Sequence, residues 1–223
     1  MKRYALILAG ILALLVGIGL VVRMLHPAGE MGATSTPQPG IATISDGTIT
    51  IAYDPTSFGL ATTEEQVVVH SYIPPCDQGF QYCFYYAATS TYTGTNFEAA
   101  GVRMDRRQDK DSQDACIESD PNGFSAYSGN TPAVVSTSDQ TVSSLDVGDA
   151  GAGHYTNGML YRLWTSGRCY EIETRIGETQ YANYPEGAIK KFTDADRARM
   201  QSLLRDLVAS ITIKNGERII LPE

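Results

Sequence analysis

Two runs of alternating apolar and polar residues within Gly158–Ile176 predict a β-hairpin. The runs flank Ser166-Gly167, a dipeptide that suits a tight two-residue turn. Folding the chain there pairs Thr165 with Arg168, Trp164 with Cys169, Leu163 with Tyr170, Arg162 with Glu171 and Tyr161 with Ile172. One face then carries Met159, Tyr161, Leu163, Tyr170 and Ile172, and the other carries Arg162, Trp164, Cys169, Glu171 and Glu173. The opposite charges of Arg162 and Glu171 lie directly across the ladder, which favours this register.

An apolar stripe with helical spacing occupies Asp194–Val208 and predicts a helix with one face on a sheet. The stripe consists of Met200, Leu203, Leu204, Leu207 and Val208. Thr193 and Asp196 have the spacing of a capping box, although aspartate replaces the more usual glutamate or glutamine. After the helix, two short runs around Asn215-Gly216, Ser210–Lys214 and Glu217–Leu221, predict a second hairpin in which Lys214 pairs with Glu217.

Shorter apolar runs predict further strands, most of them bounded by glycine, proline or aspartate. They are Thr48–Tyr53, Phe58–Leu60, Glu65–Ile73, Phe80–Thr89, Phe97–Arg106 and Thr141–Val147. The polar segment Ser112–Glu118 is predicted to form one or two helical turns. Strands joined by short turns and followed by one amphipathic helix indicate an α+β fold, in which the helix packs on an antiparallel sheet.

The N-terminal run Tyr4–Val22 contains nineteen uncharged residues and predicts a transmembrane helix. Such a helix spans roughly 28 Å, about one hydrocarbon core. Lys2 and Arg3 precede the run, so we expect the N-terminus in the cytoplasm and the remainder outside. A cleaved signal peptide is the alternative, but the run is long and no A-x-A site follows it. The predicted organisation is an anchor over 1–25, a flexible linker over 26–45 and an extracytoplasmic α+β domain over 46–223.

Three segments resemble the PsbP-like family, namely TITIAYDPTSFGLA, the hairpin YRLWTSGRCYEIE, and FTDADRARMQSLLRDLVASITI as helix then strand. They also resemble uncharacterised exported bacterial proteins with a Tyr-Arg … Cys-Tyr-Glu hairpin of this kind. The resemblance covers residues 46–214 and is closer in the last third. It implies an α/β/α sandwich and a role in binding or assembly more than catalysis, and it brings no set of catalytic residues.

The chain carries 17 basic and 25 acidic residues, a formal net charge of −8. A domain this acidic lacks the positive surface that binds nucleic acid, and anionic lipid headgroups should repel it. We therefore expect contact with the membrane through the N-terminal helix. The expected partner is another envelope protein or a small ligand.

Four cysteines on the exported side of a membrane indicate disulfides. Cys76 and Cys83 are close in sequence, so their pairing is the simplest closure and leaves Cys116 with Cys169. The other connectivities stay open, as does a free Cys169 thiol in the core. CxxC pairs and histidines at ligand spacing are lacking, so we expect no metal site and no cofactor. The segment Asp109–Asp120 lacks the glycine and glutamate of a calcium loop and is interpreted as a solvated loop.

The glycine-rich segment Gly148–His154 is predicted to be a flexible connection, with an anion nest of backbone N–H groups as the alternative. The candidate binding residues are Gly151, Gly153, His154 and Tyr155. His154 is also a candidate acid–base group, although no GxSxG motif accompanies it. The sequence thus favours a membrane-anchored binding or assembly module. The alternative is a small envelope hydrolase, which requires His154 within hydrogen-bond reach of a carboxylate and a hydroxyl.

Overall fold

Strands β8 (His154–Thr165) and β9 (Arg168–Thr179) form the predicted central hairpin. They belong to a computed structural model that describes residues 40–61, 80–118 and 131–222. All the predicted cross-strand pairs are present, from Thr165 opposite Arg168 to Tyr161 opposite Ile172. Ser166 and Gly167 have φ angles of 50° and 69°, the left-handed conformation that a type I′ turn requires at both central positions. The register predicted from the alternation is therefore confirmed.

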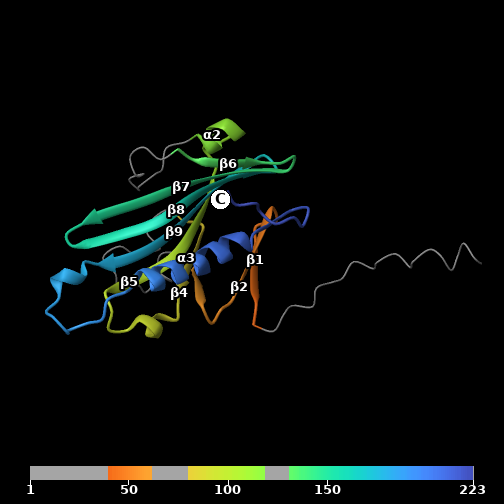
Figure 1. Ribbon diagram of the computed structural model, residues 1–223. Helices are drawn as coiled ribbons and strands as arrows, with labels where there is room; N and C mark the ends of the chain where they lie inside the picture. Colours follow the sequence, from red (N-terminus) through yellow and green to blue (C-terminus); the bar gives the residue numbers. More distant parts are fainter. Residues whose placement is uncertain (1–39, 62–79, 119–130, 223) are drawn as a thin grey trace, which may run out of the picture. The chain divides into compact units, whose positions relative to one another are not determined.

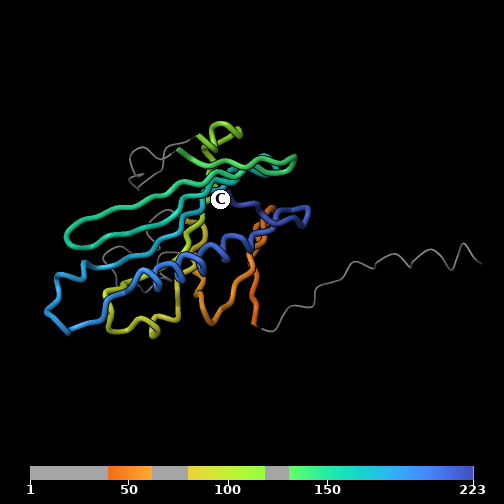
Figure 2. Tube along the Cα trace, viewed as in Figure 1, coloured from red at the N-terminus to blue at the C-terminus, as the bar shows by residue number. Residues whose placement is uncertain are grey.

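A seven-stranded sheet extends outward from this hairpin in the order β3-β4-β5-β9-β8-β7-β6 (Figure 1). Its other strands are β3 (Phe58–Ala61), β4 (Tyr82–Tyr86), β5 (Phe97–Arg107), β6 (Ala133–Ser136) and β7 (Gln140–Gly151). A smaller sheet contains β1 (Ala42–Ser45), β2 (Ile49–Tyr53) and β10 (Thr212–Ile213) in the order β1-β2-β10. Figure 2 shows the C-terminal segment, in dark blue, returning beside the orange strands β1 and β2. All neighbouring strands are antiparallel, which confirms the α+β prediction at this level.

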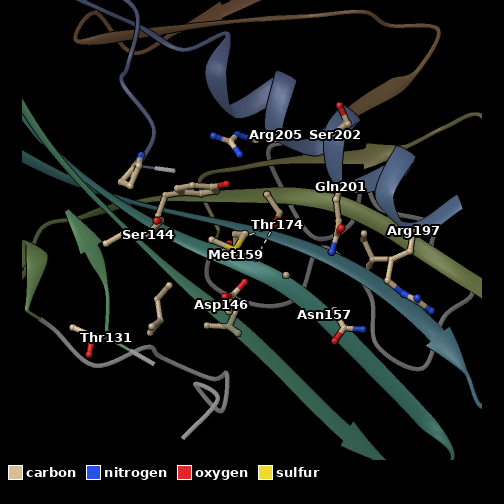
Figure 3. A pocket seen from close by; sticks show the side chains of 17 residues that line it. Thr131, Ser144, Asp146, Asn157, Met159, Thr174, Arg197, Gln201, Ser202 and Arg205 are labelled. Carbon is tan, nitrogen blue, oxygen red and sulfur yellow. Dashed lines mark hydrogen bonds between the residues drawn. The ribbon is translucent and has the colours of Figure 1, made fainter. Parts of the chain in front are cut away.

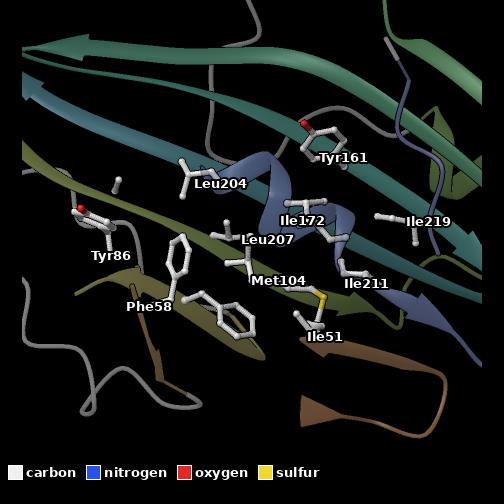
Figure 4. Packing of buried hydrophobic residues seen from close by; sticks show 14 of the residues in the cluster. Ile51, Phe58, Tyr86, Met104, Tyr161, Ile172, Leu204, Leu207, Ile211 and Ile219 are labelled. Carbon is white, nitrogen blue, oxygen red and sulfur yellow. The ribbon is translucent and has the colours of Figure 1, made fainter. Parts of the chain in front are cut away.

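Helix α3 (Asp194–Ala209) lies on one face of the large sheet, against β5 and β9, and also contacts β2. It begins with the predicted capping box, in which Thr193 N donates to Asp196 at 2.9 Å and Asp196 N donates to Thr193 at 3.2 Å. The buried residues of the helix are Met200, Leu204, Leu207 and Val208. They join apolar side chains of both sheets in the main hydrophobic core (Figure 4). The predicted apolar face is therefore the one that meets the sheet.

The opposite face of the large sheet carries a row of buried charged side chains. Glu173, which is 2% exposed, accepts hydrogen bonds from Arg175 and forms an ion pair with Arg103. Glu171 and Arg162, the predicted cross-strand pair, form an ion pair in which Arg162 Nη2 lies 3.0 Å from Glu171 Oε2. Burial raises the pKa of Glu173 because its carboxylate loses contact with water, while the neighbouring arginines oppose this effect.

The predicted helical turn is α2 (Gln113–Ile117), which contacts β7, β8 and β9. Cys116 and Cys169 form the predicted disulfide between α2 and β9, with Cα atoms 5.6 Å apart, so Cys169 is not a free thiol. Cys83 is also disulfide-bonded. Its pairing with Cys76 stays a prediction, because Cys76 lies outside the described residues.

The first strand of the fold lies within the predicted linker, since Ala42–Ser45 forms β1 and pairs with β2. Asp46 and Gly47 make the turn between them. The Asp46 carboxylate accepts the N–H groups of Thr48 and Ile49 at 2.8 and 3.0 Å, and Gly47 has a φ of 84°. An Asp-Gly turn between alternating runs is a strong hairpin signal, and here it places the start of the strand pairing before residue 46.

The C-terminal hairpin has a different register from the predicted one. Ile213 N donates to Glu217 O, and Gly216 N donates to Ile213 O, both at 2.8 Å. Glu217 therefore lies opposite Ile213, and its predicted pairing with Lys214 is wrong. Gly216 has a φ of 86°, as in three-residue loops that end in a left-handed residue. The extra loop residue shifts the pairing by one position.

Asp105 on β5 provides a test of the buried charges on the face opposite α3. Burial raises the pKa of this half-buried carboxyl to about 6, with Glu171 adding to the effect and Arg103 and Arg107 opposing it. The folded protein therefore holds this proton more tightly than the unfolded chain does. The resulting stabilisation is complete below about pH 4 and is lost as the pH rises through about 6.

We therefore expect Asp105→Asn to raise the free energy of unfolding at about pH 8 by about 1–2 kcal/mol, after allowance for solvent screening. Near pH 3 the variant and the wild type should have nearly the same stability, because the wild-type carboxyl is then largely protonated in both states. Urea denaturation at the two pH values measures this. A gain of equal size at both would attribute the effect to packing and contradict the ionisation argument.

Candidate functional site

The predicted binding residues lie at the tip of the β7–β8 hairpin. The segment from Gly148 to Gly151 continues β7, with Gly151 opposite His154, so it is neither a flexible connection nor an anion nest. Successive N–H groups of an extended strand point in alternate directions and do not converge on one anion. Gly153 is in the turn with a φ of 81°, and a Cβ there would lie 2.5 Å from Asn183 Nδ2. The Asn183 side chain is exposed and could move away, so it is the left-handed φ that favours glycine at this position.

His154 and Tyr155 project to opposite faces of the sheet, because they are consecutive residues of β8. Nδ1 of His154 lies 3.0 Å from each carboxylate oxygen of Glu98. The Tyr155 hydroxyl donates to Glu178 at 3.1 Å. The two candidate residues therefore do not share a site. Glu98 supplies the carboxylate that the hydrolase hypothesis requires. That hypothesis stays an alternative to the binding function.

Glu178 connects Tyr155 to a groove beside α3. Its carboxylate is fully buried and accepts hydrogen bonds from Arg197 Nε at 2.7 Å and Nη2 at 2.8 Å. Asp194 accepts a third bond, from Arg197 Nη1, at 2.6 Å. These bonds, above all those to Glu178, raise the pKa of Arg197. Arg197 is therefore a charged side chain held in place at one end of the groove.

The groove has a volume of about 970 Å³ and lies between α3 and strands β7, β8 and β9 (Figure 3). Most side chains that line it are polar. The polar ones are Arg197, Gln201, Ser202 and Arg205 from the helix, and Ser144, Asp146, Asn157, Tyr161 and Thr174 from the strands, with Thr131 before β6; Met159 is among the apolar ones. Figure 3 shows Gln201 extending from the helix toward the strands, and Asp146 extending from β7 toward the helix. Because α3 packs over β5 and β9, the α3-facing side of β7 and β8 is left as the floor.

Two hydroxyl groups at this floor lack a hydrogen-bond partner among the described residues. They belong to Tyr161 and Ser144, which are 4% and 6% exposed and lie directly opposite each other in the β7–β8 ladder. Burial raises the pKa of Tyr161, while the charge of Arg205 lowers it and that of Asp146 raises it further. Both charges therefore lie close to the Tyr161 hydroxyl.

A local break in the β8–β9 ladder shapes the same floor. The pairing is regular up to Asn157 and resumes at Leu160. Between them, Met159 N donates to the Thr174 hydroxyl at 2.8 Å instead of to a main-chain carbonyl (Figure 3). Gly158 permits this arrangement, because a Cβ there would lie only 1.8 Å from the carbonyl oxygen of Thr174. The break places a side-chain hydroxyl and a glycine beneath the groove.

Comparison with known proteins adds no function, since no family model and no curated protein matches the chain. Among the described residues, no group of three or more His, Cys, Asp or Glu side chains is arranged to hold a metal ion.

None of the described helices is long and apolar enough to cross a membrane. The predicted transmembrane run Tyr4–Val22 lies outside the described residues. The predicted strand Glu65–Ile73 also lies outside them.

The groove is not apparent from the sequence alone. One signal was present, because Arg197, Gln201 and Arg205 are spaced at i, i+4 and i+8 and so form a polar edge beside the apolar stripe of α3. The floor residues Tyr161 and Ser144 could not be assigned to it, because their position beneath that edge depends on where α3 crosses the sheet.

Proposed function

We propose that the chain is a membrane-anchored extracytoplasmic binding module whose ligand occupies the groove beside α3. The observation that carries this proposal is the pair of Tyr161 and Ser144 hydroxyls, which open into the groove and have no hydrogen-bond partner among the described residues. Both hydroxyl oxygens are accessible to water from the groove, since among the described residues only the Thr156 hydroxyl is both buried and without a hydrogen-bond partner. A polar ligand in the groove can therefore replace water at the Tyr161 and Ser144 hydroxyls and accept or donate the same bonds. The abundance of polar side chains around the groove supports the same ligand class.

Two observations support the extracytoplasmic location. The apolar run Tyr4–Val22 has the length of a membrane span, and the Cys116–Cys169 disulfide is typical of an oxidising compartment. The PsbP-like assignment is likewise part of the proposal. It is supported by α3 on one face of an antiparallel sheet and α2 on the other, which is the layer order of an α/β/α sandwich.

A groove-filling variant tests the binding proposal. Gln201→Trp should occupy the groove, whereas Ala198→Trp places the same side chain on an exposed position of α3 outside it. Thermal unfolding of the detergent-solubilised full chain is followed with free amino acids and peptides, neutral oligosaccharides and phosphorylated sugars. We expect one class to stabilise the wild type and Ala198→Trp by about 2–3 kcal/mol at saturation, and to leave Gln201→Trp unchanged. Equal stabilisation of both variants, or none of the wild type, would contradict the proposal.

The N-terminal segment is expected to stay attached to the mature protein, because the apolar run of Tyr4–Val22 lacks an A-x-A site at its end. Intact-mass measurement of the protein from the membrane fraction should give the full-length chain. A mature chain that begins after about residue 28, where a signal peptidase would cut, would contradict this prediction and show that the N-terminal segment is a cleaved signal peptide.

A further inference from the structure

We infer that the groove binds a zwitterion, namely an amino acid or a short peptide with free termini, with its carboxylate on Arg205 and its ammonium group on Asp146. The inference rests on the proposed binding function and specifies its ligand class. Its basis is a pair of opposite charges that line one groove and do not neutralise each other. Arg205 and Asp146 are both exposed, and no ion pair within 4.0 Å joins them.

The Arg205 guanidinium has N–H groups available to donate hydrogen bonds to a ligand in the groove. It makes no hydrogen bond or ion pair with another described residue, in contrast to Arg197, whose guanidinium is occupied by Glu178 and Asp194. A guanidinium binds a carboxylate through two parallel N–H···O bonds, which gives directional recognition. Arg205 extends from α3 over the groove, where such a carboxylate is accessible (Figure 3).

Asp146 supplies the opposite charge from the floor. Its backbone is fixed in the β7–β8 ladder opposite Met159, and its carboxylate makes no ion pair with another described residue. A purely anionic ligand on Arg205 would be repelled by Asp146, and a purely cationic ligand on Asp146 would be repelled by Arg205. A ligand that carries both charges satisfies both, so the pair selects zwitterions over singly charged ligands.

The groups between the two charges can bind the polar atoms of the same ligand. Tyr161 lies close enough to both for their charges to act on its hydroxyl, and Ser144 is its neighbour across the ladder. The Gln201 amide, which has no hydrogen-bond partner among the described residues, projects from the helix toward the floor and offers both a donor and an acceptor. These groups match the N–H and C=O groups of a peptide.

Isothermal titration with trialanine, N-acetyl-trialanine and trialanine amide tests the two charge contacts separately. The full-length protein in detergent is used at about pH 6.5, below the usual pKa of a peptide amino group, so that trialanine is zwitterionic. We expect trialanine to bind about tenfold more tightly than either blocked peptide, since each loses one charge-assisted contact.

Charge-removing variants identify the residue that contacts each terminus. Arg205→Gln should weaken trialanine about tenfold and leave trialanine amide unchanged, because that peptide has no carboxylate to lose. Asp146→Asn should weaken trialanine in the same way and leave N-acetyl-trialanine unchanged. Arg199→Gln and Asp206→Asn are matched controls, since they remove the same charges from exposed positions of α3 outside the groove and should change nothing.

The outcomes separate this inference from the proposed function. Equal affinity of the three peptides, or equal effects of Arg205→Gln and Arg199→Gln, would contradict the inference that the groove selects zwitterions. The proposed binding function of the groove would stand. Failure of trialanine and free amino acids to bind, with Gln201→Trp still abolishing stabilisation by a sugar or phosphorylated compound, would also overturn only the inference. Lack of binding by every class would overturn both.

Discussion

Leu204→Ala is expected to lower the free energy of unfolding by about 2–5 kcal/mol, the usual cost of a large-to-small change in a well-packed core. Leu204 is 1% exposed and lies in the α3 face that packs on the sheet (Figure 4). Removal of its side chain leaves a cavity between the helix and the strands, and alanine does not disturb the helix itself because its helix propensity is higher. Urea denaturation, with an unchanged slope, measures the loss.

Leu203→Ala is the matched control. It makes the same chemical change one position away, at a side chain that is half-buried at the edge of the core. The expected loss is about 1 kcal/mol, because less apolar surface returns to water and the cavity is open to solvent. A loss at Leu204 below about 0.5 kcal/mol, or equal losses at both positions, would show that another face of α3 is buried.

The elements that the sequence predicted correctly are those in which several local signals agree. In the β8–β9 hairpin, the alternation, the Ser166-Gly167 turn and the Arg162–Glu171 pair all specify the same register. In α3, the capping box and the apolar stripe specify the same start and the same buried face. Agreement among such signals leaves few competing structures, so these parts of the fold are predictable without an alignment.

The differences arise where one local signal had to be weighed against tertiary contacts. Gly148–Gly151 has the composition of a loop, yet β8 supplies a paired strand along its whole length. The tail after Gly216 has the pattern of a strand, but its backbone is bound by a side chain: Gln140 donates to Arg218 O at 3.0 Å and accepts from Ile220 N at 3.2 Å. Such contacts join residues about 80 positions apart, and local propensity does not report them.

The groove could be predicted only in part, for a related reason. Its helical edge is visible in the sequence, but Arg205 becomes a candidate ligand contact only because α3 leaves β7 and β8 uncovered. Conversely, His154 and Tyr155 look like members of one site because they are adjacent in sequence, but consecutive residues of a strand project to opposite faces of the sheet. A site whose residues come together only because a helix crosses particular strands can therefore be recognised only in the tertiary structure.

Replacement of both Cys116 and Cys169 by alanine is expected to lower the free energy of unfolding by about 4 kcal/mol. The bridge joins residues separated by 53 positions, and in the chain-entropy model closure of a loop of this length restricts the unfolded chain by about that amount. The two cysteines are fully buried between α2 and β9, so the loss of packing adds to the effect. The bridge also connects a polar segment with little apolar surface of its own to the centre of the sheet.

A second double variant, Cys76→Ala with Cys83→Ala, is the control for this prediction. These cysteines enclose only six residues, so the same model gives about 2–3 kcal/mol for their closure. Urea denaturation compares the free energies of unfolding of the two variants.

Near-UV circular dichroism adds a local readout, since the single tryptophan, Trp164, is half-buried and lies directly opposite Cys169. The spectrum should change in the Cys116/Cys169 variant and not in the control. A smaller loss of stability than in the control, with an unchanged spectrum, would mean that the sheet holds α2 without the bridge.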